Sequence, residues 1–184
     1  DAPDGSLRGA TSYDLIASAF FAYSTSLLIK AGNVIGRDMG GYERLYEGIA
    51  DAFRSKFLNT DADEYNTQTA YSLALCFDLA DDRKEMARRL AELIRKNGGK
   101  IATGFVGTPY VLYALSENGY ADVAFDLLLS EKYPSWLYCV NHGATTIWEH
   151  WDGIRDDGTM WSADMNSFNH YAYGAVADWM YGAA

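Results

Sequence analysis

The sequence has 184 residues, of which 49% are hydrophobic and 22% are charged. This length and composition fit one globular domain with a substantial core, and they exclude disordered and fibrous proteins. Fifteen Lys and Arg residues stand against 25 Asp and Glu residues, which gives a formal net charge of -10. Such a chain repels nucleic acid phosphates and anionic membrane surfaces, so we expect no nucleic acid partner and no membrane partner.

The first predicted element is a helix from Tyr13 to Ala31, which Asn33 and Gly36 end. Its charge-free stretch, Leu15 to Ile29, is shorter than the roughly 20 residues that a bilayer crossing requires. The helix is apolar around nearly its whole circumference, so we expect other elements to enclose it.

The next segments alternate between two kinds of helix. Residues Tyr42 to Phe57 have one apolar and one charged face, whereas Thr69 to Leu79 is almost wholly uncharged. Residues Arg83 to Lys96 again have one charged face, and Asp82 is the expected N-cap of this helix. The pattern indicates uniformly apolar helices inside and one-faced helices outside.

The alternation continues with a helix that we expect to start at Thr108-Pro109 and stop at Asn118-Gly119. A companion helix is predicted from Tyr120 to Leu129, and Gly104 to Gly107 is interpreted as a tight turn. Strict two-residue alternation of Val, Ile and Thr is absent, which argues against a large sheet. The fold class expected is therefore all-α, as an (α/α)6 barrel or toroid of two helical layers, with a plain helical bundle as the alternative.

The character of the chain changes after Pro134. All five tryptophans lie between Trp136 and Trp179, and the three histidines are His142, His150 and His170. Residues 152–158 are predicted to form an irregular loop, and helical spacing returns over 166–181. Any chemistry is expected in this region.

Glu149 stands between Trp148 and Trp151. An apolar wall raises the pKa of a carboxyl group, and flat rings suit the apolar face of a pyranose, so the cluster fits a glycosidase site. The alternative is that both tryptophans are core residues and that Glu149 points to solvent. His170 has two readings of equal weight, a functional group or a hydrogen-bonded core residue.

Other kinds of site are disfavoured. His142, Glu149, His150 and Asp152 are ligand types, but their spacing matches no familiar metal motif, so no metal is expected. No Gly-x-Ser-x-Gly string occurs, which disfavours a serine nucleophile. We expect no cofactor.

Two strings in the chain resemble a known family. The first runs from Gly143 to Glu149 and continues as Trp151-Asp152-Gly153, and the second runs from Met165 to Gly174. Both closely resemble the catalytic barrel of bacterial α-L-rhamnosidases of glycoside hydrolase family 78. Thr103-Gly104-Phe105 and Tyr133-Pro134-Ser135-Trp136 look like further landmarks of the same family.

The resemblance implies an (α/α)6 barrel that hydrolyses terminal α-L-rhamnosides with inversion of configuration. It puts Glu149 at the position of the general base and His170 at that of the histidine that contacts the sugar. The substrate-binding residues that it implies are His170, Trp148, Trp151, Phe105 and Asn169. The partner expected is a small carbohydrate, a rhamnoside.

The chain also departs from the family pattern. Nothing in it matches the acidic motif that supplies the general acid, and His150 stands where Arg is common. The sequence predicts roughly seven or eight helices, against the twelve of a complete (α/α)6 barrel. We therefore interpret residues 1–184 as a single domain, the C-terminal portion of the catalytic barrel, with the general acid lying upstream.

An incomplete barrel has further consequences. The chain alone is expected to hydrolyse rhamnosides poorly or not at all, and to associate with itself through exposed apolar faces. Two other functions stay open at this point. One is another αα-barrel carbohydrate enzyme, glucoamylase-like or a phosphorylase, and the other is a helical module that binds sugar without catalysis.

Overall fold

The computed structural model describes residues 9–60, 62–164 and 166–183. Met165 of the second sequence string lies outside the described residues. Within the described ranges the chain forms eight α-helices and no β-strand, and an isolated bridge joins Ile154 to Met160. The helices are α1 (Tyr13–Val34), α2 (Gly40–Phe53), α3 (Gln68–Cys76), α4 (Arg83–Lys96), α5 (Gly104–Ser116), α6 (Ala121–Leu128), α7 (Trp136–Asn141) and α8 (Val176–Ala183). A π-helical turn, η1 (Arg54–Leu58), extends α2, and a 3-10 turn, η2 (Ala172–Ala175), leads into α8.

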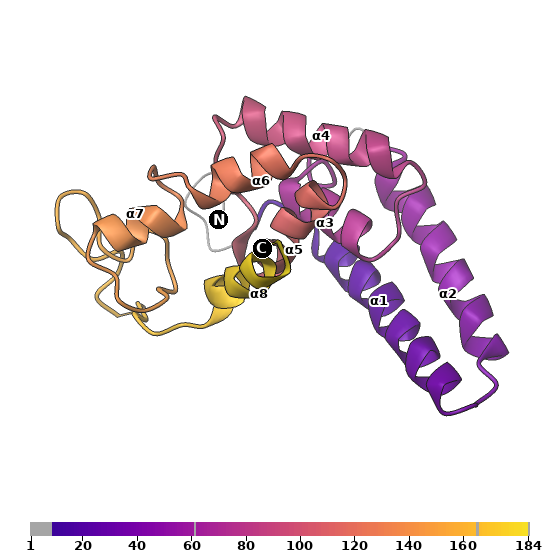
Figure 1. Ribbon diagram of the computed structural model, residues 1–184. Helices are drawn as coiled ribbons and strands as arrows, with labels where there is room; N and C mark the ends of the chain where they lie inside the picture. Colours follow the sequence, from indigo (N-terminus) through magenta and orange to yellow (C-terminus); the bar gives the residue numbers. More distant parts are fainter. Residues whose placement is uncertain (1–8, 61, 165, 184) are drawn as a thin grey trace.

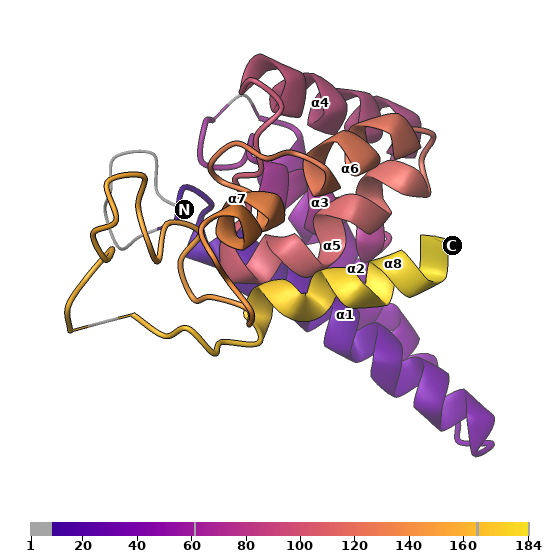
Figure 2. The same ribbon diagram turned by 60° about the vertical axis from the view of Figure 1, so that its left-hand side comes forward.

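The helices form two layers (Figure 1). In the inner layer α1 contacts α3, α3 contacts α5, and α5 contacts α8. The outer helices α2, α4 and α6 each pack against the inner helix that precedes them. Figure 2 shows α8 running alongside α5. The predicted alternation of inner and outer helices is thereby confirmed, and the all-α class with it.

Local sequence signals explain the outer helix α4. The Asp82 side chain accepts a hydrogen bond from the Glu85 backbone N–H at 3.0 Å, which confirms it as the N-cap. The exposed face carries an ion pair between Arg88 and Glu85, while Leu90 is fully buried on the opposite face. The observed bounds agree with the predicted ones.

The closest helix contact joins α3 to α5. A Cβ atom added to Gly107 would lie 2.5 Å from Thr69 Oγ1, so only glycine lets the two helices approach this closely. The Thr69 hydroxyl donates to the Thr103 carbonyl at 2.9 Å. The buried Gln68 side chain donates to the Lys100 carbonyl at 2.9 Å and accepts from the Ala102 N–H at 2.8 Å. These bonds fix residues 100–103, the segment that leads into α5.

The start of α5 differs from the prediction. The helix begins at Gly104, so residues 104–107 form its first turn and Pro109 lies inside it. The Thr108 hydroxyl donates back to the Gly104 carbonyl instead of capping a new helix. The tertiary bonds at Thr103 favour the earlier start, which the local signal at Thr108-Pro109 does not reveal.

The inner helix α1 also differs from the prediction, because it is not enclosed. Phe21, Leu28 and Val34 are 52%, 47% and 87% exposed. The helix packs mainly against α2 and α3, and its Phe20 ring also meets Tyr110 of α5 at 6.3 Å. With 22 residues and a mean hydropathy of 1.4, α1 is long and apolar enough to cross a membrane, and 28% of its most apolar window is buried.

The C-terminal region is less helical than predicted. Residues 166–171 are irregular, and regular structure resumes only at η2. Helix α7 was not predicted, and the Ser135 hydroxyl caps it by accepting from the Tyr138 N–H at 3.0 Å. Residues 152–158 form a loop, as predicted. Residues 166–171 are irregular because their backbone groups pair with the segment around Glu149.

Candidate active site

The two sequence strings lie side by side. The Glu149 N–H donates to the Ser167 carbonyl at 2.9 Å, and the His170 N–H donates to the Ile147 carbonyl at 2.8 Å. The two segments therefore run in opposite directions and hold each other by backbone hydrogen bonds. The Thr146 hydroxyl adds a bond to the Phe168 carbonyl. This pairing brings Glu149 and His170, which are 21 positions apart, into one neighbourhood.

The Glu149 side chain is half-buried. Its Oε2 atom accepts a hydrogen bond from the Ser167 backbone N–H at 3.0 Å. Backbone and side chain of Glu149 thus both bond to Ser167, and the carboxylate has a fixed orientation instead of pointing freely into solvent. A positioned carboxylate with an open oxygen can accept a proton from a bound water.

His170 precedes η2 and packs against the first turn of α5. Its ring stacks on that of Phe105, with centroids 4.7 Å apart and planes at 18°. Its Nδ1 atom accepts from the Ala172 N–H at 3.4 Å, so in the neutral ring Nε2 carries the proton and can donate to a ligand. Phe105 is 42% exposed, and Asn169 is exposed beside them.

His150 stands directly after Glu149 in the chain. Its ring stacks on Trp161 at 3.7 Å, and its Nε2 atom is buried with no hydrogen-bond partner in the described residues. Burial lowers the pKa of His150 below 6.5, the charges of Glu149 and Asp152 oppose this shift, and His170 adds to it. Burial is thus the main cause of the lowered pKa of His150.

The tryptophans that flank Glu149 belong to the core. Trp148 and Trp151 are 4% and 3% exposed. The ring of Trp151 stacks on Tyr173 at 3.9 Å and meets Trp136 edge to face at 5.2 Å. Both flanking residues thus anchor the segment that carries Glu149.

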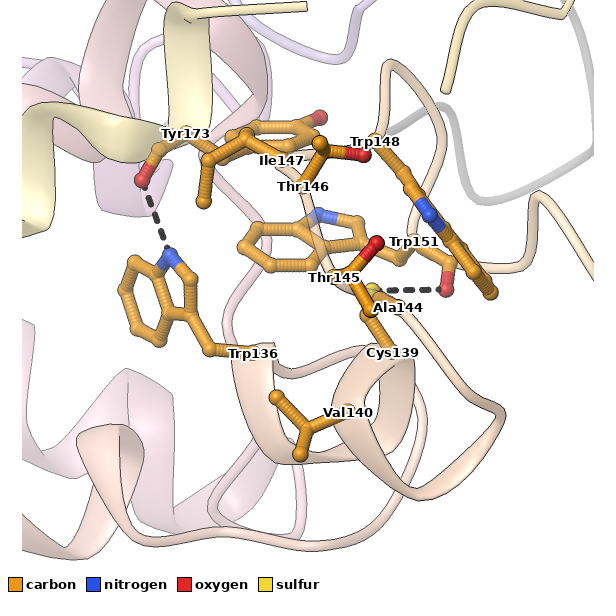
Figure 3. Close-up of a pocket in the computed structure, with 10 residues that line it drawn as sticks. All are labelled: Trp136, Cys139, Val140, Ala144, Thr145, Thr146, Ile147, Trp148, Trp151 and Tyr173. Carbon is orange, nitrogen blue, oxygen red and sulfur yellow. Dashed lines mark hydrogen bonds between the residues drawn. The ribbon is translucent and has the colours of Figure 1, made fainter. Parts of the chain in front are cut away.

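A cavity of about 310 Å³ adjoins these rings (Figure 3). Its lining is mostly apolar and consists of Trp136, Cys139, Val140, Ala144, Thr145, Thr146, Ile147, Trp148, Trp151 and Tyr173. Glu149, Phe105, Asn169 and His170 do not line it. The two tryptophans therefore border this cavity, and Glu149 lies outside its lining.

The contacts of Ser167, Trp161 and Tyr173 were not anticipated. Ser167 lies inside the second string, but no local rule indicates that its N–H meets Glu149. No local sequence pattern predicts that Trp161 contacts His150, because the two rings meet only through the fold of the loop between them. No group of three or more His, Cys, Asp and Glu side chains within the described part could hold a metal ion.

The two-layer fold defines the class of this chain as an all-α domain of inner and outer helices. The paired strings put Glu149 and His170 on adjacent segments, and the His170 ring stacks on the exposed ring of Phe105 in the first turn of α5. Polar groups of this kind beside a flat ring are typical of sugar sites.

The chain belongs to the bacterial α-L-rhamnosidase six-hairpin glycosidase domain family, whose model matches residues 2–184. It is 44% identical to an α-L-rhamnosidase of Formosa agariphila over 184 residues, covering 97% of this chain and 20% of that protein. An α-L-rhamnosidase of Streptomyces avermitilis is 41% identical over 193 residues, covering 97% of this chain and 19% of that protein.

Solved structures give the same result. The crystal structure of the Streptomyces avermitilis α-L-rhamnosidase complexed with L-rhamnose matches with a TM-score of 0.88 and 42% identity, over 92% of this chain and 17% of that one. The Aspergillus terreus α-L-rhamnosidase matches with a TM-score of 0.88 and 31% identity, over 94% and 21%. The chain spans about a fifth of the length of the relatives that it matches, so it contains part of a six-hairpin domain.

Proposed function

We propose that residues 1–184 form a single domain, the C-terminal portion of the catalytic barrel of an inverting α-L-rhamnosidase. Its substrates would be terminal α-L-rhamnosides, and Glu149 would be the general base. The observation that carries this proposal is the backbone pairing of the two strings, which puts Glu149 and His170 on adjacent segments while the Ser167 N–H holds the Glu149 carboxylate. The names of the relatives support the choice of sugar.

In this mechanism the ionised Glu149 holds a water on the face of the sugar opposite the leaving group. It takes the proton of that water as the oxocarbenium-like transition state forms. The Nε2–H of His170 donates to a sugar hydroxyl, and the ring of Phe105 supports an apolar face of the pyranose. Asn169 offers an exposed amide to the same ligand.

Trp148 and Trp151 complete the proposed substrate-binding set. At 4% and 3% exposure they offer a sugar very little surface. Their larger contribution would be to hold Glu149 in position.

An inverting glycosidase needs a second carboxyl group, roughly 6.5 to 9.5 Å from the base, as the general acid. We assign this group to a part of the whole enzyme outside residues 1–184. The chain alone should then show little turnover of 4-nitrophenyl α-L-rhamnoside. Substantial turnover would contradict this assignment and make Asp152 and Asp164 the first candidates for the acid.

The direct test exchanges this chain for the matching segment of the Streptomyces avermitilis enzyme and introduces Glu149→Gln there. The amide keeps the shape of the side chain but cannot accept the proton, so kcat should fall by about 100-fold or more. Glu131→Gln, at an exposed position, serves as the matched control and should leave kcat unchanged.

Rhamnosides and glucosides are assayed in parallel. Full activity of Glu149→Gln would overturn the assignment of the base. A preference for glucosides would favour another αα-barrel enzyme, and sugar binding without turnover in the exchanged protein would favour a non-catalytic module.

A further inference from the structure

A cluster of three polar side chains, which the proposed mechanism does not use, attaches the loop over residues 152–161 to α7. Asp156 belongs to this loop, and His142 is the residue that ends α7. The Asp156 Oδ1 atom accepts a hydrogen bond from the Tyr138 hydroxyl at 3.1 Å, and the same atom lies 3.1 Å from His142 Nε2. The Tyr138 and His142 rings stack, with centroids 4.0 Å apart. One carboxylate oxygen therefore joins the loop to two rings of the helix.

The His142 ring faces an acceptor at each of its two nitrogens. Its Nδ1 atom lies 2.8 Å from the Tyr138 carbonyl, which can only accept a hydrogen bond. A neutral imidazole has a single N–H, so when Nδ1 donates to this carbonyl, Nε2 directs a lone pair at the Asp156 carboxylate. The doubly protonated ring donates at both nitrogens and sets its positive charge beside the carboxylate. The arrangement thus suits the imidazolium and disfavours the neutral ring.

The other end of the loop lies beside the proposed general base. The Trp161 N–H donates to the Gly153 carbonyl at 3.2 Å, which closes the loop on itself. The Trp161 ring stacks on that of His150, the residue after Glu149, with centroids 3.7 Å apart. The bond from Asp156 to α7 and the ring contact of Trp161 are thus two attachments of one hydrogen-bonded loop.

We propose that His142 is a proton-dependent latch: the imidazolium holds the loop against α7 through Asp156, and loss of one proton to solvent releases the loop. This latch does not depend on which sugar the domain binds. An imidazole ordinarily changes its charge between about pH 5 and pH 8, so the loop is held more firmly at the lower pH. The Asp156 side chain is 86% exposed, and solvent screening therefore keeps the effect moderate.

The neighbouring tyrosines and the ion pair of the loop keep their charge states over this range. Burial, followed by the hydrogen bond to Asp156, raises the pKa of Tyr138 to about 12, so its hydroxyl stays a donor. Burial also raises the pKa of Tyr133, whose ring meets that of Tyr138 at 5.6 Å. Asp152 and Arg155 of the loop pair with each other at 3.5 Å.

His150 is a second titratable ring at this loop, and it acts in the opposite direction. Burial lowers the pKa of His150, so its protonation at low pH disfavours the buried position against Trp161. His150 therefore loosens the loop as the pH falls, whereas the latch tightens it. The sign of the pH response separates the two histidines.

The test measures hydrogen–deuterium exchange of the 184-residue chain at pH 5.5 and pH 8.5, with each rate divided by the intrinsic exchange rate at that pH. Protection of residues 153–161 should be about two- to fivefold higher at pH 5.5. The helix α4, which contains no histidine, should show equal protection at both pH values. His142→Phe keeps a ring against Tyr138 but carries no proton, so protection of the loop should be low at both.

A second variant and a control keep the test independent of the fold of α7. Asp156→Asn removes the charge at the exposed end of the pair and should abolish the response without changing a buried side chain. Asp126→Asn, at an exposed position on α6, is the matched control and should retain it.

Equal protection of the loop at both pH values, or a response that survives His142→Phe and Asp156→Asn, would overturn the latch. Higher protection at pH 8.5 would assign the response to His150 and would also overturn it. Each of these results leaves the rhamnosidase proposal standing, because the latch uses neither Glu149 nor His170.

Discussion

The core consists of two clusters that are built in different ways. The first lies between α1, α2 and α3 and contains mainly alanine, leucine and phenylalanine side chains from regular helices. The second includes α4 to α8 and takes in Trp136, Trp148, Trp151 and Trp179. Trp148 and Trp151 come from irregular chain. The regular helix α1 nevertheless leaves large apolar residues exposed, whereas the irregular segment buries its rings, so regularity and burial are separate properties here.

Replacement of Trp151 by alanine should give the largest effect on this comparison. The substitution removes the stack on Tyr173 and the edge contact with Trp136, which leaves a void in the second cluster. The free energy of unfolding should fall by about 3–5 kcal/mol, measured by chemical denaturation. Phe21→Ala, at a residue 52% exposed on α1, should cost less than about 1 kcal/mol. Equal losses would show that the two regions are not packed differently.

The second prediction concerns α3 and α5, the helices that link the two clusters. Gly107→Ala would bring a methyl group to 2.5 Å from Thr69 Oγ1 and 2.9 Å from Thr103 Cβ. The forced separation should cost about 1–3 kcal/mol. Gly48→Ala is the matched control, because a Cβ there meets nothing within 4 Å inside α2. It should stabilise the chain by about 0.5–1 kcal/mol, and a loss at both positions would contradict the close approach.

The third prediction tests the exposed face of α1. We propose that the chain associates with itself through this face, because Leu27 and Leu28 are 44% and 47% exposed. Leu27→Gln with Leu28→Gln should raise the dissociation constant about tenfold, equal to about 1.4 kcal/mol, in sedimentation velocity. Ala31→Gln, an exposed position on the same helix, should leave it unchanged. A monomer at every concentration would refute the association.

The smallest expected effect is on the pH dependence of the free energy of unfolding, and it involves His150. Burial lowers the pKa of His150 in the folded chain below the ordinary value of 6.5. At a pH between the folded-state pKa and the unfolded-state pKa, the unfolded chain therefore binds the proton and the folded chain does not. The contribution of the neutral His150 side chain to stability is therefore complete above pH 6.5 and decreases as the pH falls. His150→Phe keeps a ring against Trp161 but cannot titrate, and it should reduce the difference in unfolding free energy between pH 7.5 and pH 5. An unchanged difference would assign the pH dependence to other groups.

Much of the helical architecture was predictable because its signals are local. Asp82 marks the start of α4, and the alternation of uniform and one-faced helices predicts the two layers. The two strings around Glu149 and His170 predict the family, which the match over residues 2–184 confirms. The roles assigned to these residues remain proposals.

Other features could not be read locally. The start of α5 at Gly104 depends on bonds from Thr69 and Gln68, more than 30 positions earlier. The irregular stretch over 166–171 has helical spacing, but its backbone groups pair with the segment around Glu149. Long-range hydrogen bonds override a local helical preference when they satisfy the same backbone groups.

The sequence by itself determined the all-α class, the layer of each helix and the family, because spacing, caps and motif strings are properties of neighbouring residues. Only the tertiary structure decided that α1 keeps an exposed face and that Trp148 and Trp151 turn into the core. It also decided that Ser167 orients Glu149 and that His170 stacks on Phe105. These features depend on which distant segments meet, and periodicity carries no information about such meetings.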